Sequence, residues 1–179
     1  MQRSKAMGTQ QIILLVINVI GGLAVMLSYV YGLKGQAGGA NVLWGNVSEG
    51  IRPLYFVSMI ISALGYFAFI YYILFRIDPA TSNISYYLFY AIFIVILGAS
   101  ALWMPLTNMY VNDVGTGLWI AVRTVLALVG LGSIALTWAL LAFHPATRGA
   151  AYWLAVGGAG YFAFHTAILD GIVWAALFR

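Results

Sequence analysis

The chain contains no cysteine, and this absence removes a whole set of chemistries. Disulfide bonds, thiolate metal sites, thiol nucleophiles and covalent attachment of c-type haem all require cysteine side chains. Histidine is scarce too, with two in the whole sequence. A functional site in this chain has to be built mostly from other residue types.

Charged residues are also few. They make up 7% of the 179 residues, while hydrophobic residues make up 64%. A soluble domain is about a quarter charged and roughly half apolar, so this composition excludes a soluble globular protein. The net charge is +4, but the basic residues are spread over separate segments and form no stripe that could follow a phosphate backbone. We therefore expect no nucleic-acid partner.

Long apolar runs divide the chain into five segments, each long enough for a helix to cross a bilayer, which takes about 20 residues. A transmembrane barrel would alternate apolar and polar residues, and these runs do not. We therefore expect one domain over residues 1–179, an all-α integral membrane protein with a bundle of five transmembrane helices in contact with the lipid bilayer. The five predicted spans cover residues 12–33, 53–75, 84–104, 118–143 and 150–178.

The four prolines fit this division. Pro53 suits a first helical turn, where a missing N–H costs nothing. Pro79 and Pro145 fall just beyond helix ends, and Pro105 closes or kinks the third span. The first apolar run is far longer than the core of a signal peptide, so it predicts a retained span.

Basic residues in short loops indicate which end of a span faces the cytoplasm. They are more numerous on the N-terminal side, which favours a multi-pass protein with a cytoplasmic N-terminus. Those on the N-terminal side are Arg3, Lys5, Arg76 and Arg148, and those on the opposite side are Lys34, Arg52 and Arg179.

Two charged residues, Arg123 and Asp170, lie inside predicted spans, where ionisable groups are costly and hence candidates for function. Antiparallel spans four and five would bring them to the same depth. The sequence therefore predicts an ion pair between them. There are two alternatives. The two residues could take part in binding or proton transfer, or the Arg123 side chain could extend alone to the membrane interface.

Span five carries small residues every four positions, a stripe that allows a partner backbone to approach closely. His165 lies deep in this span, where it needs a hydrogen-bond partner, a ligand, or a metal or haem. His165 and Asp170 would be roughly 140° apart on an α-helix, so no His–Asp relay is expected within it. His144 is predicted at the opposite end of the bundle, so no metal site is expected either. The stripe consists of Ala155, Ala159, Ala163, Ala167, Gly171 and Ala175.

Aromatic residues form 16% of the chain. Many lie near span ends, as in the interfacial belt of membrane proteins. Tyr66, Tyr90 and Tyr161 are instead predicted near the middle of spans, where a hydroxyl needs a partner. An aromatic-lined pocket with a few polar groups is what an apolar ligand requires.

The overall plan resembles a known family. Trp44 lies in a sizeable loop before Pro53-Leu54-Tyr55-Phe56, span three ends in Ala101-Leu102-Trp103-Met104-Pro105, and a short connection joins spans four and five. In these features the chain resembles the tryptophan-rich sensory protein, or translocator, family of five-helix membrane proteins. It departs from the family pattern at Ser100, which replaces an asparagine, and at Asp170.

This resemblance implies a dimeric protein that binds tetrapyrroles, sterols or similar flat apolar ligands. The positions that match the family are Trp44, Trp103, Tyr161 and Phe164.

Two functions follow from these observations. The first is a receptor or carrier that holds a tetrapyrrole, sterol or lipid-like ligand among spans two, three and five. The second is a structural subunit of a homodimer or larger membrane complex, assembled through the stripe of span five. A membrane enzyme that acts on lipid is a third, less favoured class of function. A stripe facing the chain's own bundle favours the receptor, and an outward stripe favours assembly. The candidate ligand-binding residues are Trp44, Trp103, Arg123, Tyr161, Phe164, His165 and Asp170.

Overall fold

The computed structural model describes residues 7–34 and 39–178, and these contain helices and no strand. Five helices are long and apolar enough to cross a membrane, as predicted. The first four long helices are α1 (Thr9–Lys34), α2 (Arg52–Arg76), α3 (Tyr86–Asn112) and α4 (Thr116–Ala142). The fifth runs continuously through three segments, α5 (Ala150–Ala163), η2 (Phe164–Trp174) and α6 (Ala175–Leu177). A short helix, η1 (Gly39–Trp44), lies between α1 and α2.

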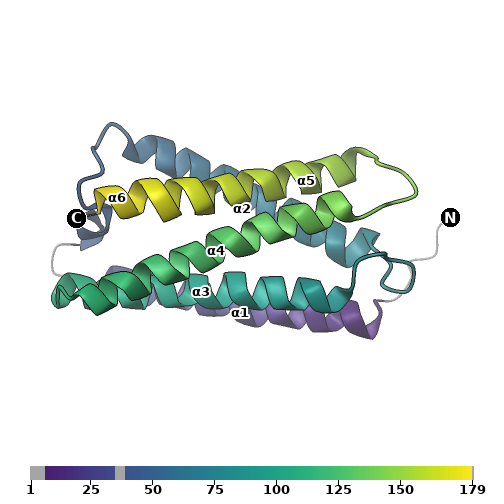
Figure 1. The fold of residues 1–179 in the computed structure, drawn as a ribbon, viewed down its shortest axis with the longest axis horizontal. Coiled ribbons are helices and arrows are strands. Elements are labelled where there is room, and N and C mark those ends of the chain that lie inside the picture. Colours follow the sequence, from purple (N-terminus) through teal and green to yellow (C-terminus); the bar gives the residue numbers. More distant parts are fainter. Residues whose placement is uncertain (1–6, 35–38, 179) are drawn as a thin grey trace.

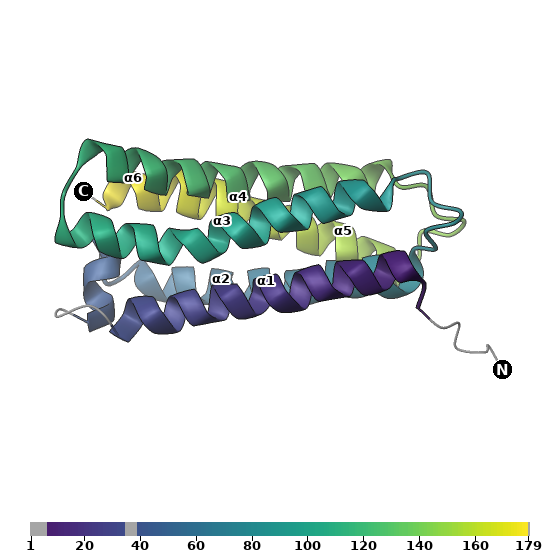
Figure 2. The same ribbon diagram turned by 90° about the horizontal axis from the view of Figure 1, so that it is seen from below.

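The helices pack as a ring in which sequence neighbours are not always spatial neighbours. α3 packs against both α1 and α4, α4 packs against the fifth helix, and the fifth helix packs against α2. α1 touches α2 only slightly. In Figure 1, the fifth helix lies above α4, α3 and α1 lie below it, and α2 passes behind it. The start of α1 and the end of α6 lie at opposite ends of the bundle, as five crossings require (Figure 2).

Helix α3 extends further than the sequence predicts. Pro105 lies inside it and does not end it. A proline inside a helix removes one backbone donor, and buried neighbours and hydroxyl side chains make this tolerable in apolar helices. The donor that Pro105 lacks is the one that would pair with the Ala101 carbonyl, four residues earlier. Of the two predictions for Pro105, the one that it closes the third span near residue 104 is therefore wrong, because the helix runs on to Asn112.

One end of the bundle is closed by the segment around η1. Trp174 Nε1 donates to the Leu43 carbonyl at 3.0 Å, and the Asn46 amide donates to the Leu177 carbonyl at 2.9 Å. Gly45 has a φ of +52° and packs directly on the backbone of Phe178, where a side chain would collide. The loop between α1 and α2 is thus attached to the end of the fifth helix.

The outer surface of the bundle is apolar. Ile20, Leu64, Trp138 and Leu154 are each about two-thirds exposed. Contiguous apolar surface on this scale is unusual in water-soluble monomers. This exposed apolar surface, like the length and composition of the helices, is consistent with a multi-pass membrane protein.

Most of the small-residue stripe of the fifth helix faces into the bundle, while Gly171 lines hollows on the outer face. Ala155, Ala159, Ala163 and Ala175 are buried, and Ala167 lies against Gly130 of α4. A second close approach joins α5 to α2, where Gly158 meets Gly65 backbone to backbone. These contacts bring α2, α4 and the fifth helix close enough for short polar side chains to reach one another.

Candidate functional site

The fifth helix changes its winding in the middle. It is α-helical to Ala163 and then π-helical over η2, residues Phe164–Trp174. A π-helix bonds residue i to i+5, so residues five apart come to lie one above the other. Long π-helical stretches are rare, and π-helical turns occur often at functional sites.

The π-helical winding brings His165 and Asp170 together. Nε2 of His165 lies 3.6 Å from a carboxylate oxygen of Asp170. The prediction that these residues do not share a face is therefore wrong, because it assumed α-helical spacing.

Two hydroxyl groups extend this contact into a chain of four polar side chains. Ser58 of α2 lies 2.9 Å from Nδ1 of His165, and the Tyr161 hydroxyl donates to Ser58 Oγ at 3.0 Å. Because Ser58 accepts from Tyr161, its own hydrogen is free for Nδ1. Neutral His165 then carries its hydrogen on Nε2, facing Asp170.

The inner members of this polar chain are buried, and its Asp170 end is open. Ser58 and His165 are 5% and 6% exposed, whereas the Asp170 side chain is 33% exposed. Buried polar groups are nearly always hydrogen-bonded, and the inner members of this chain obey that rule. Asp170 therefore has capacity to accept further hydrogen bonds that the described residues leave unused.

Both sides of η2 are tied to neighbouring helices. Tyr55 of α2 donates to the Leu169 carbonyl at 2.9 Å. On the other side, the Thr166 hydroxyl bonds Ser133 of α4 at 3.0 Å and the Phe162 carbonyl at 2.9 Å. These contacts fix the register that places His165 opposite Ser58.

Aromatic rings lie beside the open end of the chain. The Trp103 ring packs between Tyr29 of α1 and Trp174 of η2, with centroid distances of 5.7 and 5.3 Å. The Tyr55 hydroxyl donates to the carbonyl of Leu169, the residue before Asp170. Residues from α2 and α3 therefore pack against η2 on both sides of Asp170 in the sequence, and α1 reaches this region through Trp103.

Two buried polar atoms near this region have no hydrogen-bond partner among the described residues. They are Ser62 Oγ, one turn beyond Ser58 on α2, and Trp103 Nε1. Leaving a buried donor or acceptor unpaired costs about 1–3 kcal/mol. Each is therefore a group that a bound molecule or water could satisfy.

The structure brings together only some of the predicted site residues. Tyr161, His165 and Asp170 are joined directly, and Trp103 reaches the same region through its ring contacts. Trp44 instead packs on Tyr55 and Phe56 at the end of the bundle, with Arg52 over its ring. Phe164 is 46% exposed and contacts Tyr161 from the outer side.

Sequence reasoning missed Ser58, Tyr55 and Tyr29. One signal was available for Ser58 and Tyr55: they are three residues apart and so share a helix face with Ser62. No local pattern points to Tyr29, because only the ring order of the helices brings α1 to this site.

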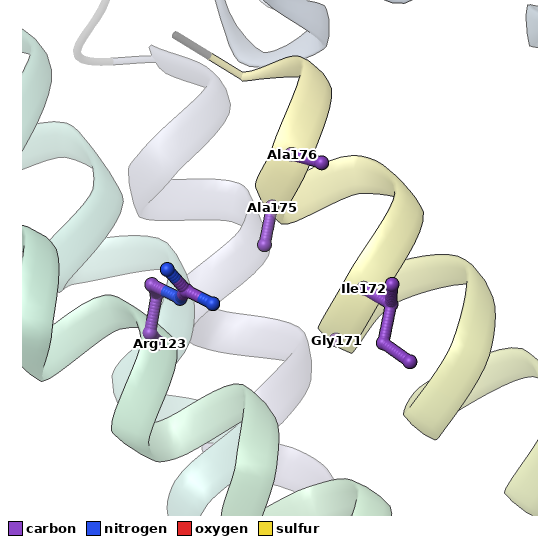
Figure 3. Close-up of a pocket in the computed structure, with 5 residues that line it drawn as sticks. All are labelled: Arg123, Gly171, Ile172, Ala175 and Ala176. Atoms are coloured by element: carbon purple, nitrogen blue, oxygen red, sulfur yellow. The ribbon is translucent and has the colours of Figure 1, made fainter.

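Arg123 does not join this site. Its side chain is exposed between α4 and the fifth helix, and no ion pair links it to Asp170 among the described residues. The predicted Arg123–Asp170 pair is therefore wrong: the Asp170 carboxylate lies beside His165, whereas Arg123 lines a hollow that does not include Asp170. Figure 3 shows Arg123 beside Gly171 and Ala175 in a shallow hollow.

Histidines do not meet in this bundle. His144 lies in the loop after α4, next to Asn83, whereas His165 lies near the middle of the fifth helix. Among the described residues, no group of three or more histidine and acidic side chains could hold a metal ion.

The chemistry of the site is set by the four side chains of the polar chain, a phenol, a hydroxyl, an imidazole and a carboxylate. Side chains of these types, connected in this order, can bind a polar group or transfer a proton.

No protein-family model, curated protein or solved structure matches this chain.

Proposed function

We propose that this protein is a multi-pass membrane receptor or carrier, with a cytoplasmic N-terminus, that binds a hydrophobic ligand within its helix bundle. The polar end of the ligand sits at Asp170, and its apolar body lies against the rings of Tyr29, Trp103 and Trp174. The observation that carries this proposal is the partly open Asp170 carboxylate at the end of a polar chain whose inner members, Ser58 and His165, are buried.

The chemistry of Asp170 limits the class of ligand. A carboxylate accepts hydrogen bonds, so the ligand needs a donor such as a hydroxyl or a pyrrole N–H at one end. Sterols and tetrapyrroles both provide one on a flat apolar body, and so do lipid-like alcohols. The resemblance to the translocator family favours the first two.

The inward stripe supports a ligand-binding bundle over a structural subunit. Its alanines are used in packing the chain's own helices, so they are not available as a close-packing surface for another protein. The assembly alternative would then require a different surface.

A lipid-modifying enzyme is the second candidate, favoured by the contacts of Ser58 with His165 and of His165 with Asp170. Serine, histidine and aspartate in this order can activate a serine nucleophile. However, Ser58 is 5% exposed and already accepts a hydrogen bond from Tyr161. A substrate carbonyl could reach it only by displacing Tyr161, so binding fits the geometry better than acyl transfer.

Thermal unfolding in mild detergent tests the proposal, with cholesterol, protoporphyrin and a long-chain alcohol as separate probes. A ligand at a hundred times its Kd stabilises the folded state by about 2.7 kcal/mol, which is easily measured. At least one probe should raise the Tm of the native protein. The increase should be lost in Asp170→Ala and kept in Asp113→Ala, which removes a carboxylate from the exposed end of α3.

Two results would count against ligand binding at this site. One is the absence of any shift with all three probes. The other is a shift of equal size in the native protein and in Asp170→Ala. Co-purification with other polypeptides in fixed ratio, without a bound ligand, would favour the structural-subunit alternative.

A further inference from the structure

Arg123 is the arginine whose charge the described part of the chain leaves unmatched. Arg52 donates to the Val47 carbonyl and lies over Trp44, and Arg76 and Arg148 lie over tyrosine rings. Arg123 lies within an apolar helix and makes no hydrogen bond, ion pair or ring contact with any described residue. A guanidinium keeps its charge and offers five donors, so it needs an anion or water.

The surface around Arg123 is hollowed. Two adjoining hollows of about 280 and 390 Å³ share Arg123 and Gly171 as lining residues. Small side chains such as Ala127 and Ala176 form much of the remaining walls, and no acidic residue lines either hollow. Figure 3 shows the guanidinium in the space between α4 and residues 171–176. The result is a positive charge beside an apolar groove on the outer face of the bundle.

The depth of Arg123 in a bilayer can be estimated from the helix length. α4 has 27 residues, which at 1.5 Å per residue gives roughly 40 Å, about 10 Å more than a hydrocarbon core. If the excess is shared between both ends, the Cα of Arg123 lies roughly 5 Å inside the core boundary. The long arginine side chain can extend over that distance to the headgroup level.

We infer that Arg123 binds the phosphate of an anionic phospholipid, with an acyl chain lying in the groove between α4 and the fifth helix. Arginine and phosphate form charge-assisted, often bidentate hydrogen bonds. An anionic headgroup is preferred over a choline headgroup, because no acidic side chain lines the hollows to accept the choline charge. This site is separate from the Asp170 site and does not depend on the function proposed for it.

Native mass spectrometry of the full chain in detergent tests this inference, with phosphatidylglycerol and phosphatidylcholine as the two probes. The native protein should bind phosphatidylglycerol more tightly. Arg123→Gln should weaken that binding at least roughly tenfold, the loss expected for one charge-assisted contact. Arg123→Lys should restore part of it. Arg148→Gln is the matched control, because it removes the same charge from the opposite end of the bundle.

A second variant separates the groove from the charge. Ala176 is exposed, so Ala176→Leu should fill the groove without disturbing the core. It should weaken phosphatidylglycerol binding while Tm stays unchanged. Glycerol phosphate, which has no acyl chain, should compete poorly with the lipid, whereas effective competition would show a site for free phosphate instead.

Several outcomes would overturn the inference. Equal phosphatidylglycerol binding by the native protein and Arg123→Gln would show that the guanidinium is not the anchor. An equal loss in Arg148→Gln would show that binding follows net charge alone. A change in oligomeric mass in Arg123→Gln, with lipid binding intact, would assign Arg123 to a protein interface.

Discussion

Gly157 and Gly158 are adjacent in α5, yet adding one methyl group should affect stability differently at each. A Cβ at Gly158 would lie 2.8 Å from Gly65 Cα and 2.9 Å from the Gly65 oxygen. A Cβ at Gly157 would meet nothing within 4 Å. The two positions therefore receive the same chemical change, one at the crossing of α2 and α5 and one in open space.

The expected magnitudes follow from two terms. Alanine is favoured over glycine inside a helix by about 1 kcal/mol, partly because it reduces the entropy of the unfolded chain. This term is common to both sites, so Gly157→Ala should stabilise by roughly 0.5–1 kcal/mol. At Gly158 it is opposed by overpacking of about 1–3 kcal/mol, because the atoms in the way are backbone and cannot swing aside. Gly158→Ala should therefore be the less stable variant by that amount.

Unfolding in one detergent, by heat or by denaturing detergent, measures the difference between the two variants. Gly65→Ala provides a check from the other helix, because its Cβ would lie 2.7 Å from the Gly158 oxygen. It should reproduce the effect of Gly158→Ala. Equal stability of Gly157→Ala and Gly158→Ala would refute the close crossing, and with it the reason that Ser58 reaches His165.

Two further predictions concern the polar groups. Ser58→Ala removes the hydrogen-bond partner of Tyr161 and of His165 Nδ1, so it should destabilise the folded protein by about 1–3 kcal/mol. Ser62→Ala removes a hydroxyl that has no partner among the described residues, so it should be neutral or stabilising. Equal effects of the two variants on unfolding of the ligand-free protein would contradict this geometry. In a double-mutant cycle, Arg123→Met and Asp170→Asn should be additive within about 0.5 kcal/mol, because the two residues do not meet. Coupling above about 1 kcal/mol would show that they do.

The helices could be predicted from the sequence because their signal is local. Length and hydropathy alone give five runs, and all five are helices long and apolar enough to cross a membrane. The end of α3 was the exception, because a proline often ends a helix but can also lie inside one, as Pro105 does. Chain order alone could not give the ring arrangement, in which α1 lies beside α3.

The candidate site could be predicted only in part. Tyr161, His165 and Asp170 were identified because polar groups are conspicuous in an apolar span. Their connections were not, because residue number fixes depth along a helix axis but not the direction in which a side chain leaves it. Arg123 and Asp170 illustrate this point, since equal depth suggested a pair that the packing of α4 against η2 does not form.

The π-helical register and the polar chain depend on one another. In an α-helix, Asp170 would lie one turn beyond Thr166, and Leu169 one turn beyond His165, so the carboxylate would turn away from the imidazole. The π-helix is intrinsically disfavoured, which is why it usually appears as single turns. Here Tyr55 holds the Leu169 carbonyl and Ser133 holds Thr166, so contacts from α2 and α4 stabilise the register from both sides. Anything that releases these contacts allows the segment to return to α-helical winding, and the carboxylate then separates from the imidazole.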